Sequence, residues 1–332
     1  MSEAPFVVFA EMPEAEGRDL SIERRELPAG ARIETFTYRG NGDALAAACR
    51  EADAVLTDYV PFDGAMLGLL NRCRLISVAA TGWDCVDVGA AAARGIRVAA
   101  VGEYCTDEVA DHTLALLLAS ERRLRDYDRQ AQGAKDWRWN EIRGLRRLSG
   151  LTLGIVGFGR IGQAVCRRAR GFGLAVLAAD PRVDAAEVRR HGAEPMALDE
   201  LLARADVVTL HCNLDAGSRN LLDRSAFEKM KKKPLLINVA RGALVDEADL
   251  AEALDRGLLR GAALDVLAED SPDLGHHPLF GRDDVLLTPH VAFYSETALD
   301  DLRRISAANI TAFLEGRPDA VFRLVPAQAR AP

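Results

Sequence analysis

Long apolar runs are missing from this sequence of 332 residues. No segment approaches the roughly 18 consecutive apolar residues that a membrane-spanning helix needs. The first residues, MSEAPFVVFAEMPEAEG, also lack the basic region and the apolar stretch of a secretory signal peptide. We therefore expect a cytoplasmic protein that does not bind a membrane.

Cysteine pairs with metal-ligand spacing are also missing. The six cysteines stand singly, without any C-x-x-C pair, at positions 49, 73, 85, 105, 166 and 212. In a reducing compartment such thiols lie in the core or in loops. The sequence therefore predicts neither disulfides nor a metal site.

An excess of basic charge is absent as well, because the formal net charge is −8 at pH 7. The basic cluster at residues 229–233 is short and precedes an apolar run, so we interpret it as a solvated helix end. Proteins that bind nucleic acid carry a basic patch or stripe instead. We expect no nucleic-acid partner.

What the sequence does contain is a regular alternation of short apolar runs and helical patterns. The runs indicate strands, and the alternation predicts parallel sheets with helices on both faces. A chain of this length, with 49% hydrophobic residues, can form two such α/β domains. The predicted strands lie within residues 5–10, 32–38, 52–58, 74–80 and 95–100 and, after an interruption, within 151–157, 174–180, 206–212, 234–240, 261–266 and 285–290.

The interruption consists of two different segments. Residues 106–124 predict a long amphipathic helix, with Thr106 as its N-terminal cap and acids in its first turn. The polar and basic segment 125–150, which contains Trp137 and Trp139, is too irregular to be a core element. A last amphipathic helix is predicted from about Thr297 to Gly316, from where the chain can return to the first domain.

The second alternation opens with a glycine-rich turn. In LGIVGFGRIGQ, Gly157, Gly159 and Gly162 have the G-x-G-x-x-G spacing between a predicted strand and a predicted helix. Such a turn lets backbone N–H groups and the helix N-terminus approach a pyrophosphate. Asp180, at the end of the next strand, is placed to accept hydrogen bonds from an adenosine ribose and to repel a 2′-phosphate, which Arg182 partly offsets. The sequence predicts NAD in preference to NADP.

Three further strand ends carry chemistry-bearing residues. Arg241 follows the strand at 234–240, and its guanidinium suits a carboxylate. His290 follows another strand and can exchange a proton near neutral pH. Between them, GAALDVLAED places Asp265, Glu269 and Asp270 after a buried strand. Because ligands meet the carboxyl ends of strands in open α/β sheets, we expect a site there.

In this order, GFGRIG, NVARGALVDE, GAALDV and TPHVAFYSE resemble the D-isomer-specific 2-hydroxy acid dehydrogenase family over nearly the whole chain. EYCTDEVADH and VAATGWDCVD are similar to its branches of C-terminal-binding proteins and of glycerate or hydroxypyruvate reductases. The resemblance implies a Rossmann NAD-binding domain at residues 104–295, inserted into a flavodoxin-like substrate domain at residues 1–103 and 296–332. The crossings near 102–106 and 295–297 would form a hinge.

The resemblance also implies roles for single residues. Arg241 matches the substrate-binding arginine, His290 the acid/base histidine, and the backbone of Ala80, Thr81 and Gly82 would bind the substrate carboxylate. Besides the glycine turn and Asp180, the implied cofactor contacts are Thr106, Arg160, Ile161, Cys212, Ala240 and Asp265.

The acid that supports His290 stays open. A gap-free count places the family's catalytic glutamate on Asp270, which is one methylene shorter, and Glu269 is its neighbour. Either the loop at 271–280 moves inward, or a water bridges to His290, or Glu269 substitutes through a shift in register. We favour Asp270.

These features predict an enzyme that transfers a hydride between NADH and a small 2-oxo acid. Two alternatives are an NAD-sensing scaffold of the C-terminal-binding-protein type and a relative that acts on phosphite or on a phosphonate-bearing oxo acid. The segment at 125–148 resembles the family's dimerisation arm, so we also expect a homodimer.

Overall fold

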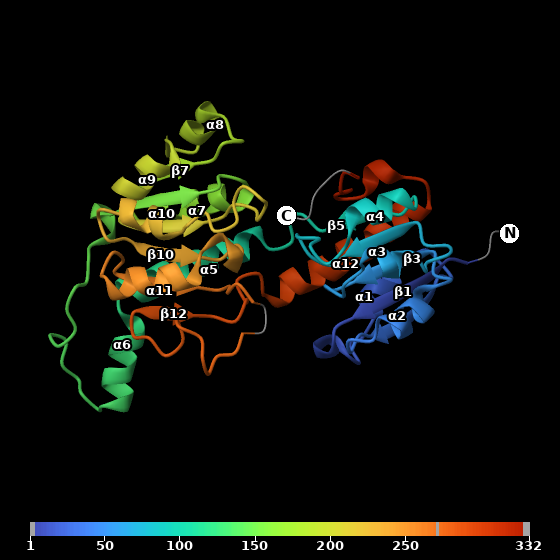
Figure 1. The fold of residues 1–332 in the computed structure, drawn as a ribbon, viewed down its shortest axis with the longest axis horizontal. Helices are drawn as coiled ribbons and strands as arrows, with labels where there is room; N and C mark the ends of the chain where they lie inside the picture. Colours follow the sequence, from blue (N-terminus) through green and yellow to red (C-terminus); the bar gives the residue numbers. More distant parts are fainter. Residues whose placement is uncertain (1–3, 270–271, 328–332) are drawn as a thin grey trace. The chain divides into compact units, whose positions relative to one another are not determined.

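The computed structural model describes residues 4–269 and 272–327. The chain divides into two compact units (Figure 1). Unit 1 comprises Met1–Tyr104 and Ser295–Pro332, and unit 2 comprises Cys105–Tyr294. Each unit is built around a parallel sheet, which confirms the predicted α/β fold class.

Unit 1 contains a five-stranded parallel sheet with the order β2-β1-β3-β4-β5, which is the flavodoxin-like order. All five strands were predicted from the sequence. They are β1 (Phe6–Glu11), β2 (Arg32–Thr37), β3 (Ala54–Thr57), β4 (Leu75–Val78) and β5 (Arg97–Ala100). The helices of this unit are α1 (Ser21–Glu26), α2 (Gly42–Cys49), α3 (Gly64–Leu67), α4 (Val88–Ala93) and α12 (Glu296–Leu314).

Different helices cover the two faces of this sheet. Val8 and Ala10 of β1 belong to a core shared with α2, α3 and α4, whereas Val7 and Phe9 belong to a core shared with α12. Because successive side chains of a strand point to opposite faces, one short apolar run supplies both cores. Burial of a side chain such as Phe9 contributes roughly 1.5–3 kcal/mol.

Helix α12, coloured red in Figure 1, joins unit 1 from the far end of the chain. The hydroxyl of Ser295 caps its first turn. Arg303 donates to both carboxylate oxygens of the buried Glu23 at 2.7 Å, and the hydroxyl of Ser77 donates to the carbonyl oxygen of Ser306 at 2.8 Å. Polar bonds as well as apolar packing therefore hold α12 on the sheet.

Unit 2 contains a seven-stranded parallel sheet with the order β12-β11-β10-β9-β6-β7-β8. Counted within the unit, this is the Rossmann order 3-2-1-4-5-6 with one more strand at the edge. The strands are β6 (Thr152–Val156), β7 (Ala175–Ala179), β8 (Glu194–Pro195), β9 (Val207–Leu210), β10 (Leu235–Asn238), β11 (Gly261–Leu264) and β12 (Val285–Leu287). The helices are α5 (Thr106–Glu121), α6 (Leu124–Asp128), α7 (Arg160–Gly171), α8 (Ala185–Arg190), α9 (Leu198–Arg204), α10 (Arg224–Lys229) and α11 (Glu247–Asp255). Among the strands of the described residues, only β8 was not predicted, because two residues that include a proline form no recognisable strand pattern.

The prediction that Thr106 caps α5 is wrong. Cys105 occupies the cap position, with φ −133° and ψ 21°, and Thr106 is the first helical residue. The helix also ends at Glu121, before residue 124, because Arg123 adopts the left-handed conformation with φ 53°. A right-handed helix cannot continue through such a residue.

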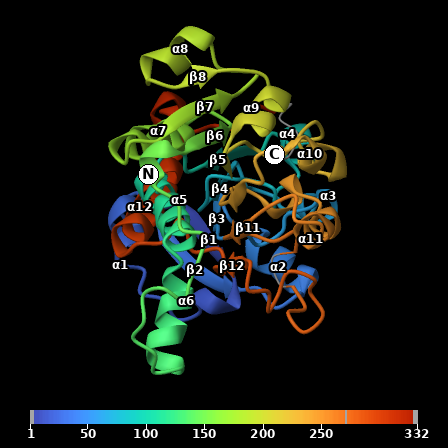
Figure 2. The same ribbon diagram turned by 90° about the vertical axis from the view of Figure 1, so that its left-hand side faces the viewer.

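The segment predicted to be irregular, 125–150, is so only in its middle part, because α6 and two short helical turns lie at its ends. After a π-helical turn at Arg129–Gly133, residues 134–147 form neither helix nor strand. Trp137 and Trp139 lie in this segment and are 92% and 82% exposed. Figure 2 shows α6 in green at one end of unit 2. The segment therefore presents two large aromatic side chains to solvent.

Candidate active site

The glycine-rich turn connects β6 to α7, and two of its glycines are required by close packing. Gly157 has φ +91°, and a Cβ atom there would lie 2.5 Å from the backbone nitrogen of Cys212. A Cβ atom on Gly162 would clash with the carbonyl oxygen of Gly157. At Gly159, in contrast, a Cβ atom would meet nothing within 4 Å. The turn is thus closed toward the protein and open at Gly159, where a ligand can approach the N-terminus of α7.

Asp180 follows β7 and faces this turn. Its Oδ2 accepts a hydrogen bond from the backbone N–H of Phe158 at 2.7 Å, and its Oδ1 accepts one from the N–H of Arg182 at 2.8 Å. The two bonds hold an acceptor group beside the open side of the turn. These residues fit a dinucleotide, with backbone N–H groups for the phosphates and a carboxylate for a ribose.

The glycine-rich turn packs against His211 and Cys212, which follow β9, the neighbour of β6 in the sheet. Burial lowers the pKa of His211 to about 3, and its Nε2 lies 2.9 Å from the hydroxyl of Thr209. Burial also raises the pKa of the Cys212 thiol to about 11. Both side chains are therefore neutral at physiological pH. The sequence reasoning did not single out His211, since a polar residue at a strand end gives no sign of such burial.

The Arg241 turn is shaped by a buried side chain that the sequence reasoning missed. Asn238, the last residue of β10, accepts a hydrogen bond from the N–H of Ala240 at 3.0 Å and donates one to the carbonyl oxygen of Arg241 at 2.9 Å. The next residue, Gly242, packs so closely that a Cβ atom would overlap the backbone of Leu267. The turn after β10 is therefore locked against the chain that leaves β11.

Asp265 organises the turn that carries His290. Its buried carboxylate accepts hydrogen bonds from the hydroxyl of Thr288 at 2.5 Å and from the N–H groups of Val291 and Ala292 at 3.0 and 2.9 Å. Its carbonyl oxygen accepts the N–H of His290 at 2.8 Å. His290 itself has φ 52°, a conformation that non-glycine residues adopt rarely and that often marks a functional site.

Helix α5 reaches the same turn through His112. The Nε2 atom of His112 lies 3.1 Å from the hydroxyl of Thr288 and 3.5 Å from the carboxylate of Asp265. His112 stood in the predicted helix without any assigned role, because its partners lie far away in the sequence. Thr106, an expected cofactor contact, lies at the start of this helix.

The acidic loop after β11 is described only in part. Asp270 lies outside the described residues, and Glu269 is exposed. Glu247 accepts the N–H of Ala268 at 2.7 Å, and its other carboxylate oxygen lies 3.2 Å from Nε2 of His277. The carboxylate of Glu247, at the start of α11, thus contacts a residue before and a residue after the two candidate acids.

The expected substrate loop belongs to unit 1, whereas Arg241 and His290 belong to unit 2. It follows β4, where the N–H of Ala79 donates to the carbonyl oxygen of Thr57 at 2.7 Å. The carbonyl oxygen of Ala80 accepts the N–H of Val101 at 2.8 Å. Thr81 and Gly82 continue the loop beyond these bonds, which anchor its start to both neighbouring strands.

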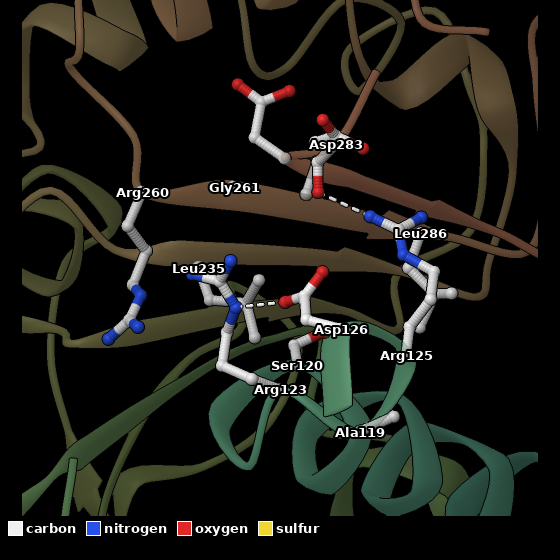
Figure 3. A pocket seen from close by; sticks show the side chains of 12 residues that line it. Ala119, Ser120, Arg123, Arg125, Asp126, Leu235, Arg260, Gly261, Asp283 and Leu286 are labelled. Carbon is white, nitrogen blue, oxygen red and sulfur yellow. Dashed lines mark hydrogen bonds and ion pairs between the residues drawn. The ribbon is translucent and has the colours of Figure 1, made fainter. Parts of the chain in front are cut away.

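A cavity lies at the opposite edge of the unit 2 sheet (Figure 3). Leu235 and Gly261, the first residues of β10 and β11, line it together with the chain that joins α5 to α6. Arg123 forms an ion pair with Asp126, and Arg125 donates to a main-chain oxygen of β12 at 2.7 Å. Because its lining includes none of the predicted site residues, this cavity is separate from the candidate site.

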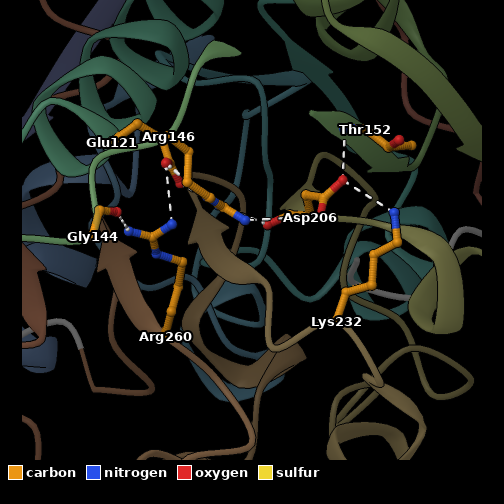
Figure 4. Close-up of polar contacts among 7 residues, drawn as sticks. All are labelled: Glu121, Gly144, Arg146, Thr152, Asp206, Lys232 and Arg260. Carbon is orange, nitrogen blue, oxygen red and sulfur yellow. Dashed lines mark hydrogen bonds and ion pairs between the residues drawn. The ribbon is translucent and has the colours of Figure 1, made fainter. Parts of the chain in front are cut away.

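Near this cavity, the buried carboxylate of Glu121 holds two arginines (Figure 4). Arg146 Nε donates to it at 3.0 Å, and Arg260 Nη1 donates at 3.3 Å. Arg260 also donates to the carbonyl oxygen of Gly144 at 3.0 Å, and Arg146 to that of Asp206 at 3.2 Å. The network ties the end of the irregular segment to the amino edge of the sheet.

Two kinds of feature are absent from the part of the chain that the structure describes. Within residues 4–269 and 272–327, no three His, Cys, Asp or Glu side chains group together in a way that suits a metal ion. None of the helices in these ranges is long and apolar enough to cross a membrane.

Comparison with known proteins identifies the unit that holds the glycine turn. Residues 114–292 match the family model described as D-isomer specific 2-hydroxyacid dehydrogenase, NAD binding domain. The predicted cofactor, NAD, is thereby confirmed for this domain.

Relatives match over most of the chain. It is 38% identical over 282 residues to the D-3-phosphoglycerate dehydrogenase of Mycobacterium tuberculosis, covering 84% of this chain and 53% of that protein. It is 35% identical over 279 residues to the glycerate dehydrogenase of Methylorubrum extorquens, covering 81% of this chain and 85% of that protein. The chain spans about half the length of the mycobacterial relatives.

A solved structure is similar over both units. The D-lactate dehydrogenase from Aquifex aeolicus, complexed with NAD and lactic acid, matches with a TM-score of 0.84 and 27% identity. The match covers 96% of this chain and 98% of that one.

Proposed function

Because the chain belongs to the D-isomer specific 2-hydroxyacid dehydrogenase family, we propose that it interconverts a small 2-oxo acid and the corresponding D-2-hydroxy acid with NAD. One observation carries the proposal: Arg241 and His290 follow strands of the same parallel sheet as the Gly157 turn, so they leave it at the same edge. The left-handed backbone of His290, held by Asp265, supports a functional role for that edge.

In this proposal the protein supplies binding, orientation and a proton. Arg241 and the backbone of Ala80, Thr81 and Gly82 hold the carboxylate of the substrate. In the direction of reduction, His290 gives a proton to the oxygen of the former carbonyl group. Asp270, or Glu269 beside it, stabilises the protonated imidazole.

The cofactor is held by the turn from Gly157 to Gly162, including Gly159, Arg160 and Ile161, and by Asp180. Thr106, Cys212, Ala240 and Asp265 complete the proposed contacts. Bound NAD supplies or accepts the hydride. The buried carboxylate of Asp265 already receives three hydrogen bonds from the protein. We therefore assign it a positioning role for His290 in addition to any contact with the cofactor.

A panel of 2-oxo acids with NADH, beginning with glyoxylate and hydroxypyruvate, tests the proposal. We expect at least one member to be reduced, measured as loss of NADH absorbance, and the activity to disappear in His290→Asn. The proposal is wrong if NADH binds tightly, in a fluorescence titration, but no acid on the panel is reduced. That outcome favours the scaffold alternative.

We further propose that the protein is a homodimer joined through the segment at 125–148. Two tryptophans that are more than four-fifths exposed are unusual on a monomer surface and typical of interfaces. Light scattering at micromolar concentration should give twice the mass of one chain, and Trp137→Ser with Trp139→Ser should shift the protein toward the mass of one chain. A wild-type protein with the mass of one chain contradicts this prediction.

A further inference from the structure

The loop after β9 contains an aspartate that its own turn holds in place. The Oδ1 of Asp215 accepts the N–H of Gly217 at 2.9 Å, and its backbone N–H donates to the hydroxyl of Ser218 at 2.7 Å. Its carbonyl oxygen accepts the N–H groups of Ser218 and Arg219 at 3.1 and 3.0 Å. These bonds fix the direction of the other carboxylate oxygen, Oδ2, which makes none of them.

The partner of this Oδ2 is Arg182. Its Nη2 lies 3.2 Å from Oδ2 of Asp215, and its backbone N–H donates to Asp180 at 2.8 Å. The backbone of Arg182 is thus bonded to the acid that would bind the ribose, while its guanidinium is bonded to the loop after β9. β7 and β9 flank β6 in the sheet, so the ion pair joins the two sides of the glycine turn.

The charges around this position favour a neutral ribose. Hydrogen bonds from Gly217 and Ser218, with the charge of Arg182, hold the pKa of Asp215 below its usual value, so it is ionised at neutral pH. Arg182 bonds to Asp180 through its backbone and to Asp215 through its guanidinium, so the three charged residues lie close together. Two carboxylates then oppose a single guanidinium. A 2′-phosphate, with a charge near −2, meets net repulsion there, whereas a 2′-hydroxyl does not.

We propose that Asp215 is a determinant of cofactor selectivity, because it keeps the guanidinium of Arg182 away from the 2′-phosphate of NADPH. The pair is well exposed, at 65% for Arg182 and 44% for Asp215, so its own stability is small. A weak ion pair is sufficient for this role. Once Asp215 is neutralised, the guanidinium of Arg182 is available to bind the 2′-phosphate. The inference depends on the proposed placement of the ribose at Asp180 and not on the proposed reaction.

The test is a double-mutant cycle in cofactor binding with the full-length protein. Dissociation constants for NADH and NADPH are measured by fluorescence titration for wild type, Asp215→Asn, Arg182→Ala and the double variant. Asparagine retains the oxygen that accepts the N–H of Gly217, so the turn is preserved. We expect Asp215→Asn to strengthen NADPH binding roughly tenfold and to leave NADH binding within about twofold.

The cycle separates two effects of Asp215 on NADPH binding, which are its pairing with Arg182 and its direct repulsion of the phosphate. In the Arg182→Ala background, Asp215→Asn should strengthen NADPH binding only about twofold to threefold, from the loss of direct repulsion. Equal gains in both backgrounds would show that Arg182 plays no part, and no gain in either would show that Asp215 does not affect selectivity. Either result overturns the proposal.

Two controls complete the experiment. Asp255→Asn changes the net charge equally at an exposed ion pair with Arg282, at the end of α11, and should not alter the ratio of the two affinities. Asp180→Asn should weaken NADH binding. If it does not, the placement of the ribose is wrong, independently of what Asp215 does.

Discussion

Replacement of Glu121 by alanine should destabilise unit 2 by about 3–5 kcal/mol, because it leaves two partly buried arginines without their shared carboxylate. The side chain of Glu121 is fully buried, and Arg146 and Arg260 are largely covered. Loss of the carboxylate also frees the segment near Gly144, which Arg260 holds.

Native-state hydrogen exchange of the full chain provides the measurement, because it reports the free energy of opening for β9, β10 and β11 without requiring a single unfolding transition. Glu121→Gln keeps the shape and provides a variant that folds if alanine does not, with a smaller loss. Glu200→Ala is the matched control, since its ion pair with Arg204 is exposed and should contribute little to the stability of unit 2. A loss for Glu121→Ala no larger than that of the control would contradict the prediction.

Replacement of Arg241 by alanine should lower turnover roughly a thousandfold or more, because a charge-assisted contact to the carboxylate of the substrate contributes several kcal/mol in the transition state. The affinity for NADH should stay nearly unchanged. The turn itself should survive, since Asn238 binds the main-chain oxygen of residue 241 and not its side chain.

Steady-state kinetics on the best substrate of the panel, together with NADH titration, checks this prediction. Arg241→Lys should fall between wild type and alanine, because an ammonium group keeps the charge but not the planar pair of donors. Arg256→Ala, at an exposed ion pair after α11, is a control that should leave turnover unchanged. A comparable loss of NADH affinity in Arg241→Ala would reassign the arginine to the cofactor.

Patterns that are local in the sequence predicted the fold well. Alternating apolar runs located every strand of three or more residues, because their burial leaves a continuous apolar signature. The end of α5 was misplaced, since the left-handed conformation of Arg123 has no such signature. The spacing of Gly157 and Gly162 also predicted the turn after β6. In the structure each of these glycines lies against backbone atoms that leave no room for a Cβ atom.

The supports of the candidate site could not be predicted in this way. His112 meets Thr288 across 176 positions of sequence, and nothing local to either residue signals the other. Asp265 was interpreted as a cofactor contact, but its bonds to Val291 and Ala292 depend on the path of a distant turn. These supporting roles depend on contacts between residues far apart in the sequence, which only the three-dimensional structure reveals.

The return of α12 to unit 1 has a consequence for synthesis of the chain on the ribosome. The Glu23–Arg303 bonds span 280 positions of sequence, so the face of the first sheet that contains Phe9 lacks its covering helix until residues 296–314 have emerged. At about 5–20 residues per second, translation of unit 2 takes on the order of tens of seconds. Unit 2 is continuous in sequence and can fold during that interval. The N-terminal third of the nascent chain therefore carries an uncovered apolar surface for that time, and chaperones bind surfaces of this kind.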